Sequence, residues 1–308
     1  MLENKKDFLS VNDFQRETLY SLIELGVKMK SDKKSYSKSL EGKTLGMIFE
    51  KSSTRTRVSF EVGIYELGGM GLFLSSRDIQ IGRGEPISDT AKVLSRYIDC
   101  IMIRTFEQSS VEELARTASI PVINGLTDLL HPCQAIADFQ TILEHKGKLE
   151  GVNLAFIGDG NNVAHSLGLL ASKLGVNFSI ATPEGYEMDK TITAKILENA
   201  KESGSTIKIT TDPVAAVERA DVIYTDVWTS MGQEDETEQR LQAFDGFQIN
   251  YELASVAKDD YIFMHCLPAH RGEEVSAEII DSSHSVIFDE AENRLHAQKA
   301  IMYELMKD

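Results

Sequence analysis

Short apolar runs and longer amphipathic stretches alternate along most of this 308-residue chain. The apolar runs have the length of strands and fall at 44–49, 71–74, 101–103, 121–123, 154–157, 178–181, 207–210, 222–225, 261–264 and 286–288. Stretches with helical spacing occur between or after them, at 57–67, 111–118, 164–174, 192–200 and 292–306. This alternation is typical of parallel sheets covered by helices on both faces. We therefore expect an α/β fold with doubly wound parallel sheets.

The length of the chain predicts two domains, because 308 residues exceed what one compact core usually holds. A polar segment with two glycines, 144–151, lies near the middle and is the expected junction. We place a first domain at 1–148 and a second at 149–288. The last helical stretch follows the final apolar run, so residues 289–308 are expected to return to the first domain.

Composition and charge limit the possible partners. The chain is 42% apolar and 26% charged, which is ordinary for a soluble globular protein. It has no apolar run of membrane-spanning length and no signal or transit peptide pattern, so we expect a cytoplasmic protein. The net charge of −16 argues against nucleic acid or an anionic membrane as a partner. An anionic substrate would have to be held by closely placed arginines.

The three cysteines, Cys100, Cys133 and Cys266, are widely spaced. In a cytoplasmic chain they form neither a disulfide framework nor a zinc-ligand pattern. We expect no metal site. Cys100 lies in an apolar stretch and is predicted to be a small buried side chain, whereas the other two lie in polar motifs.

The turn after the first apolar run carries hydroxyl groups and arginines. Its sequence, residues 49–57, is Phe-Glu-Lys-Ser-Ser-Thr-Arg-Thr-Arg. Ligands of parallel sheets bind beyond the carboxyl ends of strands, and helix N-termini favour anions. Arginine adds a planar fork that matches phosphate oxygens. The motif favours a phosphate site, and an ordinary Ser or Thr helix cap is the alternative.

Two further polar positions follow apolar runs. Arg104 ends the run at 101–103, where a surface arginine is the alternative interpretation. His131 and Gln134 flank a proline at an expected helix start, as His-Pro-Cys-Gln. Both could donate hydrogen bonds to a carbonyl oxygen held there, although a lone histidine is more often structural.

Together, the motifs at 53–56, at Arg104 and at 131–134 resemble the carbamoyl phosphate site of the aspartate/ornithine carbamoyltransferase family. The resemblance extends along nearly the whole chain. It implies that the phosphate lies on Ser53, Thr54, Arg55 and Thr56, and that the carbonyl and amide end is reached by Arg104, His131 and Gln134. Gln80, in a loop that approaches a neighbouring subunit in this family, matches a further contact of the ornithine branch. The family is built on trimers, so a homotrimer or an assembly of trimers is expected.

The first motif of the second half is Phe-Ile-Gly-Asp-Gly-Asn-Asn over residues 156–162. A dinucleotide site is the rival interpretation, but the third glycine of the G-x-G-x-x-G pattern is missing. Asparagines at this turn suit a carboxylate or an amide. The resemblance implies that Asn162 contacts ornithine.

The motif at 225–234, Thr-Asp-Val-Trp-Thr-Ser-Met-Gly-Gln-Glu, follows another apolar run. An acid at the end of a strand can pair with an ammonium group, so Asp226 is a candidate for the α-ammonium of an amino acid. A helix cap and a mobile surface turn are the alternatives. The motif is similar to the ornithine-binding loop of the family, which implies that Ser230 and Met231 also bind ornithine.

Two motifs near the C-terminus complete the predicted site. Cys266 and Leu267 follow the run at 261–264, and Arg294 opens the last helical stretch. A nucleophilic role for Cys266 would need an oriented neighbouring base. The resemblance implies instead that Cys266 and Leu267 line the reaction centre, that Cys266 orients the amine, and that Arg294 reaches carbamoyl phosphate.

The resemblance implies a step of arginine metabolism that needs no metal or organic cofactor. The δ-amine of L-ornithine would attack carbamoyl phosphate, giving L-citrulline and phosphate. Arg104, His131 and Thr56 would stabilise the developing oxyanion, while Arg55 holds the phosphate. Three alternatives remain open: a carbamoyltransferase for putrescine or a modified ornithine, a Rossmann-type dehydrogenase, and a non-catalytic partner protein.

Overall fold

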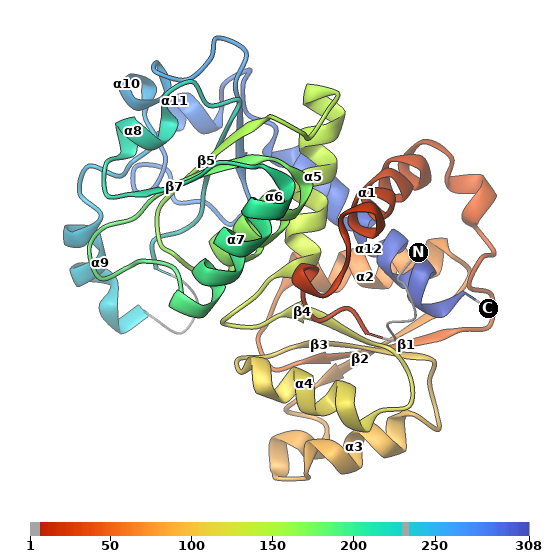
Figure 1. Cartoon of the computed structure of the whole chain (residues 1–308). Coiled ribbons are helices and arrows are strands. Elements are labelled where there is room, and N and C mark those ends of the chain that lie inside the picture. The colour runs from red at the N-terminus through yellow and green to blue at the C-terminus, as the bar shows by residue number, and fades with distance from the viewer. Residues whose placement is uncertain (1–6, 230–233, 308) are drawn as a thin grey trace. The chain divides into compact units, whose positions relative to one another are not determined.

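The computed structural model describes residues 7–229 and 234–307. The chain divides into two compact units, each with its own parallel sheet (Figure 1). The first unit comprises Met1–Gln140 and Glu292–Asp308, and the second comprises Thr141–Ala291. The expected α/β fold with two parallel sheets is confirmed. The division falls inside a helix, before the polar segment 144–151.

The sheet of the first unit has the order β2-β1-β3-β4. Its strands are β1 (Thr44–Phe49), β2 (Met70–Ser75), β3 (Cys100–Arg104) and β4 (Val122–Leu126). Its helices are α1 (Arg16–Ser31), α2 (Thr54–Glu66), α3 (Ile87–Leu94), α4 (Gln108–Thr117) and most of α5 (Pro132–Lys146), with short 3-10 helices at Val11–Asp13, Lys33–Tyr36 and Gln80–Arg83. The α3 and α4 helices cover one face of the sheet (Figure 1). Ile48, Ile101 and Ile103 are buried there against Val111 and Leu114.

The sheet of the second unit has the order β7-β6-β5-β8-β9. Its strands are β5 (Asn153–Ile157), β6 (Asn177–Ala181), β7 (Ile207–Thr210), β8 (Val222–Thr225) and β9 (Ile262–His265). Its helices are α6 (Asn162–Leu174), α7 (Lys190–Ser203), α8 (Pro213–Val217), α9 (Thr237–Ala243), α10 (Tyr251–Ala254) and α11 (Ala277–Ile280), with a 3-10 helix at Glu234–Glu236. The order reverses direction at β5 and β8, which places a topological switch point between these strands.

The last helix, α12 (Ile287–Met306), returns to the first unit, as the sequence predicted. It packs closely against α2 because Gly63 faces it. A Cβ atom on Gly63 would lie 2.9 Å from Cε of Met302 and 3.3 Å from Cγ of Lys299. A larger residue at position 63 would therefore push the two helices apart.

The prediction of a strand at 286–288 is wrong, because this apolar run begins α12. The Val286 N–H still bonds to the Phe263 carbonyl, as a strand residue would, but the Val286 carbonyl already accepts from the Glu290 N–H at 2.9 Å. Two acidic residues, Asp289 and Glu290, lie in the first turn and suit a helix N-terminus. Such short apolar runs are ambiguous between strand and helix by pattern alone.

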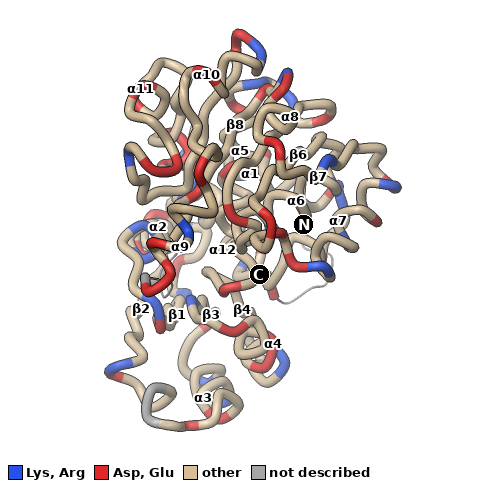
Figure 2. The backbone as a smooth tube through the Cα atoms, turned by 90° about the vertical axis from the view of Figure 1, so that its left-hand side faces the viewer, with Lys and Arg blue, Asp and Glu red and all other residues tan. Residues whose placement is uncertain are grey.

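Among the described residues, no helix combines the length and the apolar character needed to cross a membrane. Acidic residues occur along elements of both units (Figure 2). Any anion bound by this chain therefore depends on local groups rather than on the overall field.

Candidate functional site

The Ser-Thr-Arg-Thr motif forms the N-terminus of α2, directly beyond β1. Ser53 is the N-cap: its backbone is extended, and its hydroxyl accepts the Thr56 N–H at 3.2 Å. The first turn of a helix has backbone N–H groups without intrahelical partners, and its dipole favours an anion. Ser53 is thus a helix cap, and the turn that it caps is suited to a phosphate group. The two interpretations of this motif are compatible.

The Thr56 hydroxyl is the point where three elements of the first unit meet. Its Oγ1 accepts from Nη1 of Arg104, at the end of β3, at 3.4 Å. It also accepts from Nη2 of Arg294, on α12, at 3.1 Å. Arg104 and Arg294 are both buried. Two buried guanidinium groups around one hydroxyl give this unit a strongly positive site inside a chain of net charge −16.

Gln134 joins this cluster from α5 and is itself held in place. Its Oε1 accepts from Nη1 of Arg294, and its Nε2 donates to Oδ1 of the buried Asp138 at 2.8 Å. Because the amide nitrogen faces Asp138, the oxygen is the atom on the arginine side. Gln134 is therefore oriented to accept a hydrogen bond, as from a carbamoyl N–H, rather than to donate one to a carbonyl.

His131 is buried beside this cluster. Burial, and then the charges of Arg294 and Arg104, hold the pKa of His131 well below its ordinary value of 6.5. The imidazole is therefore neutral in the folded protein. A neutral imidazole carries one N–H that can donate to a carbonyl oxygen without adding charge.

The depressed pKa of His131 predicts a loss of stability in mild acid. Below about pH 6.5 the unfolded chain binds a proton at His131 that the folded chain does not, so stability falls by about 1.4 kcal/mol per pH unit from this group. The variant His131→Gln should lose this contribution. We expect the free energy of unfolding, measured by urea denaturation, to fall more steeply between about pH 7 and pH 5.5 for the natural chain than for the variant. Parallel losses would contradict the assignment.

The other residues predicted for carbamoyl phosphate are more exposed than the Thr56 cluster. Arg55 is half-buried and Thr54 exposed, both in the first turn of α2. Gln80 is exposed at the start of the 3-10 helix Gln80–Arg83. Among the described residues, no hydrogen bond joins Gln80 to the Thr56 cluster.

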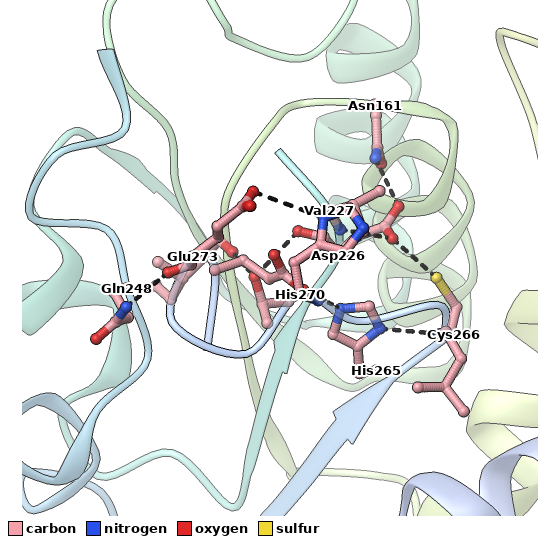
Figure 3. A network of polar contacts seen from close by, with 12 residues as sticks. Asn161, Asp226, Val227, Gln248, His265, Cys266, His270 and Glu273 are labelled. Atoms are coloured by element: carbon pink, nitrogen blue, oxygen red, sulfur yellow. Dashed lines mark hydrogen bonds and ion pairs between the residues drawn. The ribbon is translucent and has the colours of Figure 1, made fainter. Parts of the chain in front are cut away.

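In the second unit, polar residues gather at the carboxyl ends of three neighbouring strands, β5, β8 and β9 (Figure 3). Asp226, directly after β8, is the centre of this group. Its Oδ1 accepts from Sγ of Cys266 at 3.0 Å, and its Oδ2 accepts from Nδ2 of Asn161 at 2.8 Å. The Val227 N–H also donates to Oδ1, at 2.8 Å. Asp226 is thereby fixed at the edge where ligands of such sheets bind.

Asn161 is the asparagine of the Gly-Asp-Gly-Asn-Asn turn that contacts Asp226. It is also the N-cap of α6, since its Oδ1 accepts from the N–H groups of Val163 and Ala164. The residue predicted from the sequence to contact ornithine is its neighbour Asn162, which is the first residue of α6. Asn161 was missed, although an asparagine directly before a helix is a recognisable cap signal.

The geometry around Cys266 does not support covalent catalysis. The neighbouring His265 accepts the Leu267 N–H at its Nδ1, at 2.9 Å, while its Nε2 lies 3.1 Å from Oε1 of the buried Glu274. This fixes the tautomer, with the proton on Nε2, and uses both ring nitrogens. The thiol itself donates to the Asp226 carboxylate. The histidine next to Cys266 is thus engaged elsewhere and does not act as the base of a Cys-His pair.

Leu267 is held in an unusual conformation by the same histidine. Its φ is 58°, in the left-handed region that costs a branched residue about 1 kcal/mol or more. The hydrogen bond from its N–H to His265 helps to hold this backbone turn beyond β9.

A buried ion pair joins the Gly-Asp-Gly-Asn-Asn turn to the segment after β8. Nη1 of Arg240, on α9, donates to Oδ2 of Asp159 at 2.7 Å and to the Trp228 carbonyl at 2.9 Å. Burial raises the pKa of Asp159, and the bond to Arg240 opposes this rise. This contact could not be predicted from the sequence, because no spacing rule relates positions so far apart. Ser230 and Met231 lie outside the described residues.

Cys100 and Cys133 are buried side chains in the first unit. Burial raises the pKa of the Cys133 thiol to about 12, although Arg294 opposes the rise, and the thiol faces the Asn124 carbonyl at 3.4 Å. Burial also raises the pKa of Cys100. The prediction that Cys100 is a small buried side chain is confirmed. Thiols of this kind are unreactive at neutral pH.

Comparison with known proteins connects each unit to a family. Residues 6–144 match the carbamoyl phosphate-binding domain of the aspartate/ornithine carbamoyltransferases, and residues 150–305 match the aspartate/ornithine-binding domain. The chain is 60% identical over 305 residues to the ornithine carbamoyltransferase of Oceanobacillus iheyensis, covering 98% of this chain and 95% of that one. It is 59% identical over 299 residues to that of Thermococcus kodakarensis, covering 96% and 95%.

Solved structures of ornithine carbamoyltransferases are also similar to this chain. The ornithine carbamoyltransferase of Pyrococcus furiosus superposes with a TM-score of 0.94 at 54% identity, covering 97% of this chain and 96% of that one. The anabolic enzyme of Campylobacter jejuni gives a TM-score of 0.93 at 43% identity, covering 98% and 99%. With both domains matched, and with an arginine cluster in one unit and a carboxylate-thiol pair in the other, the chain belongs to the aspartate/ornithine carbamoyltransferase family.

Proposed function

We propose that this chain transfers the carbamoyl group of carbamoyl phosphate to the δ-amine of L-ornithine, giving L-citrulline and phosphate. The observation that carries the choice of acceptor is Asp226. A carboxylate held at the switch point of the second sheet can pair with the α-ammonium group of an amino acid. An aspartate acceptor would instead need cationic groups there, for its second carboxylate. The curated relatives are named as ornithine carbamoyltransferases, which supports the same choice.

The residues of the first unit are assigned to carbamoyl phosphate. The phosphate lies at the N-terminus of α2, where backbone N–H groups and Arg55 face it. The carbonyl oxygen of the carbamoyl group receives hydrogen bonds from Arg104 and His131, and the amide N–H groups of the carbamoyl group donate to Gln134. The proposed set in this unit is Ser53, Thr54, Arg55, Thr56, Gln80, Arg104, His131, Gln134 and Arg294. The expectation that Cys266 and Leu267 also line the reaction centre stays a prediction from the sequence. Asn162, Asp226, Ser230 and Met231 are assigned to ornithine.

The proposed reaction begins with the neutral δ-amine. Its nitrogen lone pair attacks the carbonyl carbon, and a tetrahedral oxyanion forms. Arg104, His131 and Thr56 face this oxygen and stabilise its charge. The intermediate then collapses: the bond from carbon to the bridging oxygen breaks and phosphate departs. The δ-nitrogen, now bonded to the carbonyl carbon, gives one proton to the departing phosphate. The enzyme gains from holding both reactants at bond-forming distance. The same residues serve in arginine synthesis or breakdown.

The experiment that tests this proposal is a carbamoyl transfer assay with four acceptors. Ornithine, putrescine, N-acetylornithine and aspartate are each offered with carbamoyl phosphate, and the carbamoylated product is measured. The proposal expects a clear preference for ornithine. A preference for any other acceptor would overturn the assignment of Asp226 to an α-ammonium group, and tight NADH binding would favour a dehydrogenase. A cytoplasmic location stays a prediction from the sequence.

We also propose that the chain forms a homotrimer or an assembly of trimers. The first unit carries exposed apolar side chains on α2. Val58, Val62 and Tyr65 lie on one face of this helix, and Phe73 of the edge strand β2 lies on the same side of the sheet, against Arg57 of α2. An exposed apolar helix face next to a sheet edge is expected to be covered by a partner. Family membership supports further copies of the chain as that partner, in a trimer.

The variant Val62→Asp should weaken this self-association. A charge at the centre of the apolar face would have to be buried without a partner, so the assembly should dissociate at protein concentrations that leave the natural chain associated. Sedimentation velocity measures the mass. Val214→Asp, at an exposed valine of α8 in the second unit, is the control and should keep the natural mass. Equal masses for all three proteins would place the interface elsewhere.

A further inference from the structure

Gln298 lies fully buried on α12, one helical turn after Arg294. Residues four apart on a helix lie on the same face, so both side chains point toward α2. A buried amide is retained at such a position only if its polar atoms find partners, because an unsatisfied buried amide costs stability. The neighbours of Gln298 show which partners those are.

One end of the Gln298 amide faces only N–H donors and is therefore the oxygen. It accepts from Nε of Arg294 at 3.2 Å and from Nη2 at 2.9 Å. The nitrogen, at the other end, donates to the Ser59 hydroxyl at 2.5 Å. Ser59 in turn donates to the backbone carbonyl of Arg55 at 2.6 Å. The amide thus connects Arg294 to the first turn of α2, where the phosphate is proposed to bind.

This contact fixes the plane of the Arg294 guanidinium. A guanidinium is a rigid planar fork, so holding its Nε edge sets the direction of the other N–H groups. With Gln298 on that edge, Nη2 reaches Thr56 and Nη1 reaches Gln134. Without it, the side chain could rotate about its last flexible bonds, and both contacts would loosen.

The same pair of helices contains a contrasting contact. Lys299, the next residue of α12, is also fully buried, and its Nζ forms an ion pair with the Glu66 carboxylate at 2.6 Å. There a carboxylate compensates the charge of a structural cation. At Arg294 the residue on the Nε edge is a neutral amide, which orients the guanidinium without cancelling its charge.

We propose that Gln298 is a positioning residue for carbamoyl phosphate: it aligns the guanidinium group of Arg294 by accepting two of its hydrogen bonds. This inference rests on the proposed function, since Arg294 is assigned to that substrate. Gln298 acts through Arg294, and the two hydrogen bonds that it accepts are the means.

The variant Gln298→Met tests this role, because it keeps the length of the side chain and removes its hydrogen bonds. Hydrogen bonds to charged groups are strong enough that we expect the KM for carbamoyl phosphate to rise about tenfold. The KM for ornithine should stay within about twofold, the scatter expected for an uncoupled site. Gln298→Glu keeps an acceptor but adds a negative charge beside Arg294, so it should raise the KM for carbamoyl phosphate at least as much.

A second measurement does not depend on turnover. Calorimetric titration with inorganic phosphate should show affinity reduced about tenfold in Gln298→Met. Gln140→Met is the matched control. Gln140 is another buried glutamine of the first unit and also donates to α12, at Oδ1 of Asn293, 3.1 Å away. This control should lose stability but keep the natural affinity for phosphate.

The outcomes separate the two proposals. If Gln298→Met lowers the melting temperature while both KM values and phosphate affinity stay natural, Gln298 is only structural and the inference fails. If the natural chain forms no citrulline, the proposed function fails, and phosphate binding still decides the role of Gln298. If Gln298→Met does not fold, Ser59→Ala replaces it, since it removes the partner of the amide nitrogen. Ser59→Ala should weaken phosphate binding about threefold, and natural affinity would contradict the inference.

Discussion

Replacing Arg55 with alanine is expected to lower kcat/KM for carbamoyl phosphate by about a hundredfold to a thousandfold. Arg55 lies in the first turn of α2, where the helix dipole and the unpaired N–H groups already favour an anion. In the proposed site, its guanidinium would add a bidentate contact to the phosphate that strengthens as the leaving group gains charge. Initial rates of citrulline formation over a range of carbamoyl phosphate concentrations measure the effect.

The fold should tolerate this change, because Arg55 is only half-buried and is not part of the Thr56 cluster. We expect the melting temperature of Arg55→Ala to stay close to that of the natural chain. Arg116→Ala is the control: Arg116 is an exposed arginine in the last turn of α4, and its loss should leave kcat/KM unchanged. Full activity in Arg55→Ala would remove the basis for placing the phosphate at α2.

Replacing Asp226 with asparagine should lower kcat/KM for ornithine by about a hundredfold or more, with little change in the KM for carbamoyl phosphate. The substitution removes the charge that we propose to pair with the α-ammonium group. It also replaces one carboxylate oxygen with an NH2 group. Cys266 donates to one of these oxygens and Asn161 to the other, so one of the two donors loses its acceptor. Ornithine then loses the contact to its α-ammonium group, and its δ-amine is less well oriented for the reaction. Steady-state kinetics with each substrate varied in turn separates the two KM values.

The same strand provides a matched control. Asp221 directly precedes β8, at the opposite end of the strand from Asp226, and accepts the Asn153 N–H at 2.8 Å and Nζ of Lys258 at 2.7 Å. Asp221→Asn should therefore cost stability without changing the KM for ornithine. If Asp226→Asn retained the natural KM for ornithine, the acceptor would have to bind elsewhere.

The positions of the candidate residues along the chain could be predicted because parallel sheets bind ligands at one edge. Arg104 was expected at the end of an apolar run and is the last residue of β3. Asp226 was expected at a strand end and directly follows β8. Both predictions needed only the register of apolar and polar residues, which is local information. The same reasoning failed at 286–288, where three apolar residues did not distinguish a strand from the start of α12.

The partners of these residues could not be predicted in the same way. Three elements far apart in sequence bring Arg104, Arg294 and Thr56 together, and no spacing rule relates a position on α2 to one on α12. The choice between neighbouring asparagines is similar. Asn161 faces Asp226 because it caps α6, and the side-chain direction of a cap depends on where the helix starts.

The sequence by itself determined the α/β architecture and the strand ends where chemistry is placed, and its motifs pointed to the family, because periodicity and turn chemistry are properties of contiguous residues. The tertiary structure decided how the side chains are oriented. It turned Gln134 into an acceptor by pairing it with Asp138, and it kept His131 neutral by burying it beside two arginines. It also placed Gln298 on the edge of Arg294. These features arise from packing and charge between distant segments, and such contacts exist only once the chain has folded.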